Sequence, residues 1–360
     1  MAETNPDLVA AADTLCRDPS FRKVLWGHLD GRRPDGDIGE LRTHIHAEDQ
    51  MLRHSLRHWD DANRSVSQYY AVALQQHHAA RQILALSHPG GTQGLAFLDF
   101  ACGWGRLLRF HVHSLPPSQV WASEIQPEAV RFVQEEYGVT GVESAFDPDQ
   151  VQPGHQFDFI CVASLFSHLP DALFHRWLAR LRDLLTPSGV LCFSVLGSRL
   201  VPPEVAMPNS GIHFQSSSEI EELDTRSYGT SFVTENYVRR AIAAMPGGVP
   251  ESTVRLQQAL ANEQDLYVMP KDPDRDLSGL GQFRRGAWGW VDDIAFAPGG
   301  TLYLGGWAAT LDEGPAEPVE FRVGVESFEA PIGRLREDVA KVLGDPRLAP
   351  SGGSFDQTVA

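Results

Sequence analysis

A short glycine-rich turn between two apolar segments could bind a ligand through its backbone. Within residues 95–110, an apolar segment ends at Asp99, and Gly103 and Gly105 follow in a turn before a second apolar segment. Small residues let the backbone pass close to a ligand, and the helix expected from Arg106 onward offers N–H groups at its positive dipole end. This arrangement suits a nucleoside ligand that carries a carboxylate.

The spacing of the glycines separates two kinds of nucleotide site. A dinucleotide-binding turn has the pattern G-x-G-x-x-G, and counting from Gly103 puts Leu108 at the third glycine position. The pattern Asp99-x-Ala101-x-Gly103-x-Gly105 instead resembles the acidic-x-Gly-x-Gly-x-Gly loop of the class I methyltransferases that use S-adenosyl-L-methionine (SAM), with alanine in place of the first glycine. A nicotinamide-dependent oxidoreductase is therefore disfavoured.

Later segments resemble the same family in the same order. The next apolar segment ends in Glu124, an acidic residue placed to accept ribose hydroxyls, and Pro127 suits the start of the helix that follows. Residues 157–170, 184–197 and 264–271 resemble the family's fourth, fifth and closing strands with their adjoining loops. The resemblance implies an α/β fold, a Rossmann-like seven-stranded methyltransferase sheet with an N-terminal helical region and a small C-terminal β domain.

The resemblance also implies which residues surround SAM. Asp99, Ala101, Gly103 and Gly105 would line the methionine and ribose region, and Glu124 would hold the ribose. The other residues implied to contact the cofactor are Ile125, Ser144, Ala145 and Phe146 around the adenine, Ser164 and Leu165 on the methionine side, and Tyr69 on a preceding helix that acts as a lid. Plain helix packing is an equal alternative for Tyr69.

Candidates for the chemistry follow the fourth strand. Methyl transfer from a sulfonium is an in-line displacement, for which alignment and desolvation supply much of the rate, and a hydroxyl acceptor also needs a base. His168 follows this strand and is the candidate base, and a structural histidine that caps the loop is the alternative. His213 and Tyr228 are candidates for contact with the acceptor.

The surrounding elements suggest a division of the chain. Residues 1–88 have helical periodicity, residues 89–271 form the methyltransferase domain, residues 272–286 are a polar linker, and residues 287–360 are a small β-rich domain. The strands expected in the second region are residues 95–100, 120–125, 157–163, 190–196 and 266–269. The last region resembles a small β-sandwich module appended to bacterial sugar-transferring and glycan-modifying enzymes, and an unpaired edge strand there would allow a homo-oligomer.

Composition narrows the classes of partner and compartment. The net charge of −17 disfavours nucleic acid and anionic membrane surfaces, and no apolar stretch is long enough to span a bilayer. The four cysteines are far apart in the sequence, which favours a reducing cytoplasm and no zinc site. His54 and His58 share a helical spacing, but no carboxylate pattern completes a metal site, so no metal is expected.

These observations predict an enzyme with SAM as its cofactor. The resemblance of the methyltransferase segments and of the C-terminal region implies a saccharide or glycan-linked acceptor and a role in polysaccharide modification. Two alternatives stay open: a methyltransferase for a small-molecule natural product, and a SAM-binding scaffold or regulator without turnover.

Overall fold

The computed structural model describes residues 4–29, 41–216, 227–323 and 326–358. The chain divides into two compact units, residues 1–282 and residues 283–360. Each unit has its own buried core, and each is described by itself below.

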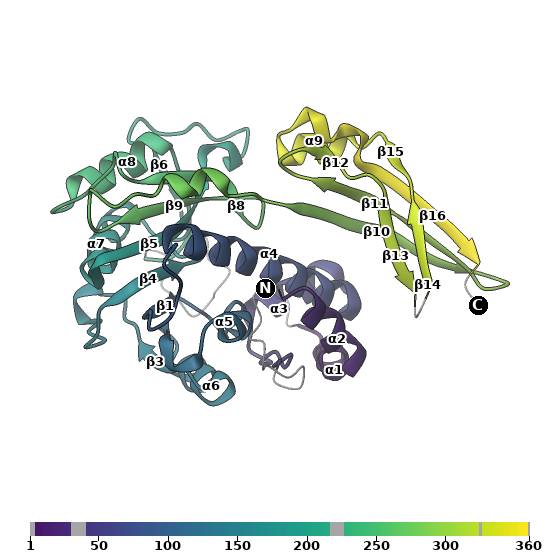
Figure 1. Cartoon of the computed structure of the whole chain (residues 1–360), viewed down its shortest axis with the longest axis horizontal. Helices are drawn as coiled ribbons and strands as arrows, with labels where there is room; N and C mark the ends of the chain where they lie inside the picture. Colours follow the sequence, from purple (N-terminus) through teal and green to yellow (C-terminus); the bar gives the residue numbers. More distant parts are fainter. Residues whose placement is uncertain (1–3, 30–40, 217–226, 324–325, 359–360) are drawn as a thin grey trace. The chain divides into compact units, whose positions relative to one another are not determined.

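A mostly parallel sheet forms the centre of the first unit (Figure 1). One path through it has the order β3-β2-β1-β4-β5-β9-β8, in which the first five strands are parallel and β9 is antiparallel to both of its neighbours. The bounds of these strands are β1 (Phe97–Phe100), β2 (Val120–Glu124), β3 (Thr140–Glu143), β4 (Phe157–Val162), β5 (Leu185–Gly197), β8 (Val254–Leu260) and β9 (Gln264–Pro270).

A hairpin extends this sheet beyond the seven strands expected from the sequence. Strands β6 (Ile212–Gln215) and β7 (Thr230–Val233) form it, and β7 pairs in parallel with Leu196 and Gly197 of β5. Strand β9 pairs with β5 only as far as Val195, so the end of the longer β5 is open to a second partner. The Rossmann-like α/β prediction is confirmed, with nine strands in the sheet rather than seven among the described residues.

Helices cover both faces of the sheet because its central strands are buried on both sides. On one face, α7 (Asp171–Asp183) and α8 (Glu235–Ala244) share the core of β1, β4 and β5. On the other face, Phe97 of β1 meets His111 of α5 (Leu108–Ser114) at a ring distance of 4.9 Å. The remaining elements here are α6 (Pro127–Tyr137) and the short helices η2 (Pro117–Gln119), η3 (Pro148–Gln150), η4 (Ser198–Leu200) and η5 (Ser278–Gln282).

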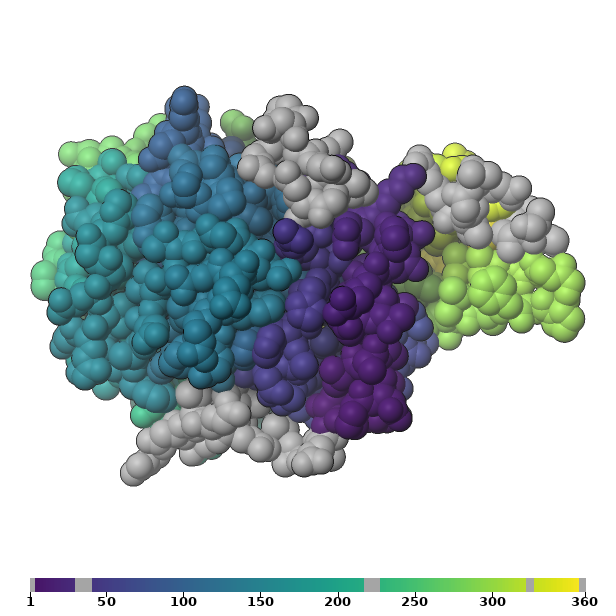
Figure 2. Space-filling view, turned by 90° about the horizontal axis from the view of Figure 1, so that it is seen from below, coloured from purple at the N-terminus to yellow at the C-terminus, as the bar shows by residue number. Residues whose placement is uncertain are grey.

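Four helices precede the sheet and pack against it in the same unit. They are α1 (Pro6–Arg17), α2 (Pro19–Gly27), α3 (Gln50–Trp59) and α4 (Ala62–Ser87). Each begins after an Asn or Asp whose side chain accepts a backbone N–H of the first turn. Their apolar faces form one cluster that includes Phe110 of α5, so the N-terminal region shares a core with the sheet region. Figure 2 shows the N-terminal part of the chain, in purple, beside the teal atoms of the segments that follow β1.

The second unit is rich in antiparallel strands. One sheet has the order β10-β11-β16-β15, with β12 paired to β11, and β13 and β14 form a separate hairpin. The elements are β10 (Ala287–Ala297), β11 (Thr301–Thr310), β12 (Gly314–Pro315), β13 (Val319–Val323), β14 (Glu326–Ala330), β15 (Ile332–Arg334), α9 (Glu337–Leu343), η6 (Pro346–Ser351) and β16 (Gly352–Thr358). Two small apolar clusters stabilise this unit.

Neither unit contains, in its described residues, a helix with the length and apolar character that a bilayer span requires.

Candidate active site

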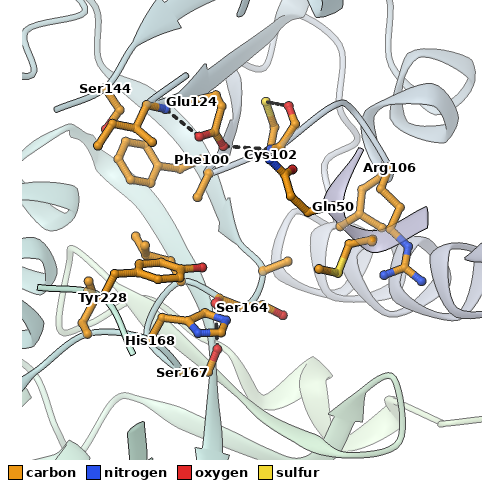
Figure 3. Close-up of a pocket in the computed structure, with 18 of the residues that line it drawn as sticks. Gln50, Phe100, Cys102, Arg106, Glu124, Ser144, Ser164, Ser167, His168 and Tyr228 are labelled. Atoms are coloured by element: carbon orange, nitrogen blue, oxygen red, sulfur yellow. Dashed lines mark hydrogen bonds between the residues drawn. The ribbon is translucent and has the colours of Figure 1, made fainter. Parts of the chain in front are cut away.

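A cavity of about 480 Å³ opens at the carboxyl ends of the parallel strands of the first unit (Figure 3). Loops meet at this edge in an open parallel sheet, which is where such folds bind ligands. The wall comes from the loops after β1, β2, β3 and β4, from helices α3 and α4, from the β8–β9 turn and from residues just before β7. Segments far apart in the sequence therefore share one cavity.

The turn after β1 has the backbone shape that its small residues predict. Ala101, Gly103 and Gly105 all have left-handed φ angles, of 59°, 55° and 78°. A Cβ built on Gly103 meets no atom within 4 Å, and Gly103 lies on the cavity wall. A Cβ on Gly105 would instead lie 2.6 Å from the Tyr137 ring and 3.2 Å from Val133 of α6. Gly105, predicted to line the cofactor site, thus lies behind the turn, where only hydrogen fits.

This difference between the glycines gives a stability prediction. We expect Gly105→Ala to lower the free energy of unfolding by about 2–4 kcal/mol, because it adds the cost of a left-handed alanine to a clash with Tyr137. Gly94 is exposed, has a left-handed φ of 74° and has no atom within 4 Å of a built Cβ, so Gly94→Ala is the matched control and should lower stability only by the cost of a left-handed alanine, about 1–2 kcal/mol. Urea unfolding measures both, and equal losses would contradict the packing role of Gly105.

Two carboxylates lie side by side where β1 and β2 end. Glu124 accepts the N–H of Gly103 at 2.9 Å and the N–H of Ile125 at 2.7 Å, so it joins the glycine turn to the end of β2. Asp99 is 2% exposed, and among the described residues nothing donates a hydrogen bond to its Oδ2 atom. Burial, and secondly the charge of Glu124, raises the pKa of Asp99 to about 7. Burial also raises the pKa of Glu124.

A buried carboxylate oxygen without a donor is costly unless a ligand supplies one. The Asp99 Oδ2 atom is therefore suited to a cationic N–H group, and the open space beside Gly103 is suited to the body of a ligand. Seven further residues predicted to contact the cofactor lie on the same wall, and these are Ala101, Ile125, Ser144, Ala145, Phe146, Ser164 and Leu165. The residues present thus fit the nucleoside and amino-acid parts of SAM.

A stacked pair of rings lies across the cavity from the carboxylates. The rings of His168 and Tyr228 are 4.6 Å apart and tilted by 13°, and both side chains are on the cavity wall (Figure 3). His168 Nδ1 lies 2.7 Å from the carbonyl oxygen of Gly229. A carbonyl oxygen only accepts, so Nδ1 carries a proton, and in the neutral ring the lone pair is then on Nε2. This tautomer is the one that a general base requires.

The segment that carries Tyr228 is fixed to the loop after β4. The Gly229 N–H donates to the carbonyl oxygen of His168 at 2.9 Å, and the Ser231 N–H donates to that of Ser167 at 2.7 Å. The hairpin that the sequence prediction lacked therefore holds Tyr228 against His168, and no pattern near His168 in the sequence indicates this contact.

Besides Gly105, two further predicted site residues lie elsewhere. Tyr69 is fully buried, and the cavity wall formed by the described residues does not include it. Its hydroxyl donates to Asp49 Oδ2 at 2.8 Å, and Asp49 caps α3 and lies on the wall. His213 faces Phe232 within the β6–β7 hairpin and is likewise not part of that wall. Tyr69 is held by packing in the helical core, and His213 by strand pairing.

Several wall residues have no signal in the sequence. Helix α3 contributes Gln50, Met51 and His54, and the β8–β9 turn contributes Gln264. Arg106 follows the glycine turn and donates through Nε and Nη2 to the carbonyl oxygen of Tyr69. Of the wall residues named in this paragraph, Arg106 alone could have been predicted from the sequence, because it directly follows the glycine turn. In the part of the chain that the structure describes, no group of three His, Cys, Asp or Glu side chains could hold a metal ion.

Residues 98–191 match the family model described as a methyltransferase domain. No curated protein matches the chain. Solved structures similar to this chain include CalS10, an amino pentose methyltransferase from Micromonospora echinaspora, at 16% identity and a TM-score of 0.38, with 55% of this chain and 91% of that one covered. The sugar N-methyltransferase KedS8 from Streptoalloteichus has 18% identity, a TM-score of 0.38, and coverage of 55% and 87%. The N-methyltransferase NodS from Bradyrhizobium japonicum has 16% identity and a TM-score of 0.36, with 56% of this chain and 88% of that one covered.

The strand order and the family match agree on the class of the first unit. It contains a class I SAM-dependent methyltransferase domain, and its cofactor is S-adenosyl-L-methionine. The predictions of the enzyme class and of the cofactor from the glycine turn and the later motifs are confirmed.

Proposed function

We propose that this methyltransferase transfers a methyl group from SAM to a saccharide or glycan-linked acceptor. One observation carries the proposal: a single cavity joins the carboxylates after β1 and β2 to the stacked His168–Tyr228 pair after β4. The first group of residues suits the cofactor, and the second suits an acceptor that must lose a proton. The polar residues Gln264 and Glu263 on the same wall support an acceptor rich in hydroxyl groups.

The cofactor end of the cavity is assigned by chemistry. Asp99 would accept the ammonium group of the methionine moiety through Oδ2. Glu124 already accepts backbone N–H groups, but a carboxylate has about four lone-pair sites and retains capacity for ribose hydroxyls. Ile125 and Phe146 would flank the adenine. When bound, SAM supplies an electrophilic methyl group on its sulfonium.

His168 would take the proton of the acceptor. Its Nδ1–H donates to the Gly229 carbonyl oxygen, and this bond strengthens when the ring becomes positively charged at Nε2. The same bond fixes the plane of the ring, so that Nε2 keeps its orientation during the reaction. The Tyr228 ring, stacked on His168, offers the acceptor an apolar face with a polar hydroxyl at its end.

The experiment separates turnover from binding. Calorimetry with SAM and S-adenosylhomocysteine measures the cofactor site, and transfer of a labelled methyl group is followed with sugars, nucleotide sugars, oligosaccharides and small natural products. Transfer to saccharides supports the proposal. Transfer only to non-sugar small molecules contradicts the acceptor class, and tight cofactor binding without any transfer would favour a scaffold or regulator.

The position of Tyr69 gives a prediction with a close control. Tyr69 and Tyr70 are both fully buried, and each hydroxyl accepts a hydrogen bond from Arg109. The Tyr69 hydroxyl donates to Asp49, whereas the Tyr70 hydroxyl donates to the carbonyl oxygen of Thr43. We expect Tyr69→Phe to weaken SAM binding about 3–10-fold, because Asp49 loses a charged hydrogen bond and α3 its anchor.

Tyr70→Phe should cost similar stability, about 1–2 kcal/mol, but change the SAM dissociation constant by less than about twofold. Calorimetry and urea unfolding of both variants distinguish the two effects. If the two substitutions weakened SAM binding equally, the hydrogen bond from Tyr69 to Asp49 would not be what supports SAM binding.

A further inference from the structure

Three residues form a closed set of hydrogen bonds beside His168, two between side chains and one from a backbone N–H group. The Ser164 N–H donates to Ser194 Oγ at 2.7 Å, the Ser194 hydroxyl donates to Gln264 Oε1 at 2.7 Å, and Gln264 Nε2 donates to Ser164 Oγ at 2.9 Å. Ser164 and Gln264 lie on the cavity wall, and Ser194 is fully buried behind them. Figure 3 shows Ser164 next to His168.

The reversed direction of β9 makes this contact. Ser164 follows the carboxyl end of β4, and an antiparallel strand begins where the parallel strands end, so Gln264 at the start of β9 reaches the same edge. The β8–β9 turn is held from the opposite side by Gln75 of α4, which accepts the Ala261 N–H at 2.5 Å and donates to the carbonyl oxygen of Ala259 at 3.2 Å. Gln264 is therefore presented by a fixed turn.

The direction of each hydrogen bond follows from the donors. Ser194 Oγ accepts a backbone N–H, and its own proton goes to Gln264 Oε1. The amide of Gln264 must then present its NH₂ group to Ser164 Oγ. Among the residues that the structure describes, none accepts the Ser164 hydroxyl proton, so that proton is available to the cavity.

The backbone of Ser164 is held in an uncommon conformation. Its φ angle is 65°, in the left-handed region that serine seldom adopts, and its carbonyl oxygen accepts the Ser167 hydroxyl at 2.7 Å. Conformations of this kind persist where surrounding contacts fix them. The direction of the Ser164 side chain is therefore set by its neighbours.

We infer that Gln264 is a positioning residue that makes the Ser164 hydroxyl a hydrogen-bond donor toward an oxygen atom of the bound ligand, an inference that rests on the proposed function. The oxygen belongs either to the carboxylate of the cofactor's methionine moiety or to a hydroxyl of the acceptor. In both cases the ligand oxygen accepts the hydrogen bond through a lone pair.

The test reverses the direction of the hydrogen bond between residue 264 and Ser164. In Gln264→Glu, both side-chain oxygens accept, so the Ser164 proton turns toward the carboxylate and is withdrawn from the cavity. Gln264→Met keeps the length of the side chain but removes both hydrogen bonds. Gln257→Glu, at an exposed position of β8, adds the same charge to the same hairpin outside the cavity and is the control. Each Gln264 substitution is also made together with Ser164→Ala.

We measure the dissociation constant of S-adenosylhomocysteine and the KM of the acceptor. Gln264→Glu should raise one of these two constants about tenfold, and by more than Gln264→Met raises it. Both constants of Gln257→Glu should stay within twofold of the wild-type values. In the Ser164→Ala background, Gln264→Glu should change the same constant by less than twofold. An increase in the dissociation constant identifies the cofactor carboxylate as the partner, and an increase in KM alone identifies the acceptor.

Two results overturn the inference: equal effects of Gln264→Glu and Gln264→Met, or an effect of Gln264→Glu that persists without the Ser164 hydroxyl. Thermal unfolding of each variant shows whether a loss reflects folding instead. The proposed function fails separately, if the wild-type protein does not bind S-adenosylhomocysteine or transfers no methyl group to any saccharide.

Discussion

Replacing His168 with alanine is expected to lower kcat about 10²–10⁴-fold while the dissociation constant of SAM stays within about twofold. The expected loss is that of a general base, because the Nδ1 proton is committed to the Gly229 carbonyl oxygen and Nε2 has the lone pair. Initial rates with a saccharide acceptor measure kcat, and calorimetry with SAM measures the dissociation constant.

A second substitution separates base catalysis from a structural role. The amide of His168→Gln can still donate to the Gly229 carbonyl oxygen but takes no proton in this pH range. His175→Ala, at a half-exposed histidine of α7 near Asp171, is the control and should leave kcat unchanged. If His168→Gln restored the rate, His168 would be a residue that holds the loop and not a base.

Asp99 is expected to make SAM binding depend on pH. In the unliganded protein its pKa is raised to about 7, so at pH 5 the carboxyl is protonated and must lose that proton to pair with an ammonium group. Between pH 5 and 7 the α-amino group of SAM stays protonated, so the dissociation constant should fall with rising pH, by at most about tenfold per pH unit. Calorimetry across this range measures the slope.

Asp99→Asn should remove this slope and weaken SAM binding about 10–100-fold at pH 7.5, since a charged hydrogen bond is lost. Asp149→Asn, at a surface carboxylate paired with Arg176, is the control and should keep the wild-type slope. An unchanged slope in Asp99→Asn would show that another group is responsible.

The same titration affects the unliganded fold. Because folding raises the pKa of Asp99 from 3.8 to about 7, the folded state favours the protonated form, and the contribution of this group to stability is lost as pH rises through that interval.

The sequence by itself determined the parallel part of the sheet in the first unit and the glycine turn after β1. Apolar strands buried on both faces, such as β4 and β5, and the alternation of strands with helices specify a parallel sheet without knowledge of distant contacts. The turn after β1 is equally local, because the small residues Ala101 and Gly103 permit its left-handed backbone within a few positions of Asp99.

The tertiary structure decided which side chains complete the site. Tyr69 and His213 have residue types suited to a site, yet packing and strand pairing direct them away from the cavity. Gln264 and the α3 residues have no motif, but the antiparallel β9 and the helical core bring them to the wall. Local sequence patterns indicate which secondary structure a segment prefers. The contacts of a side chain depend on segments that come together only when the chain folds. Periodicity within one segment does not predict those contacts.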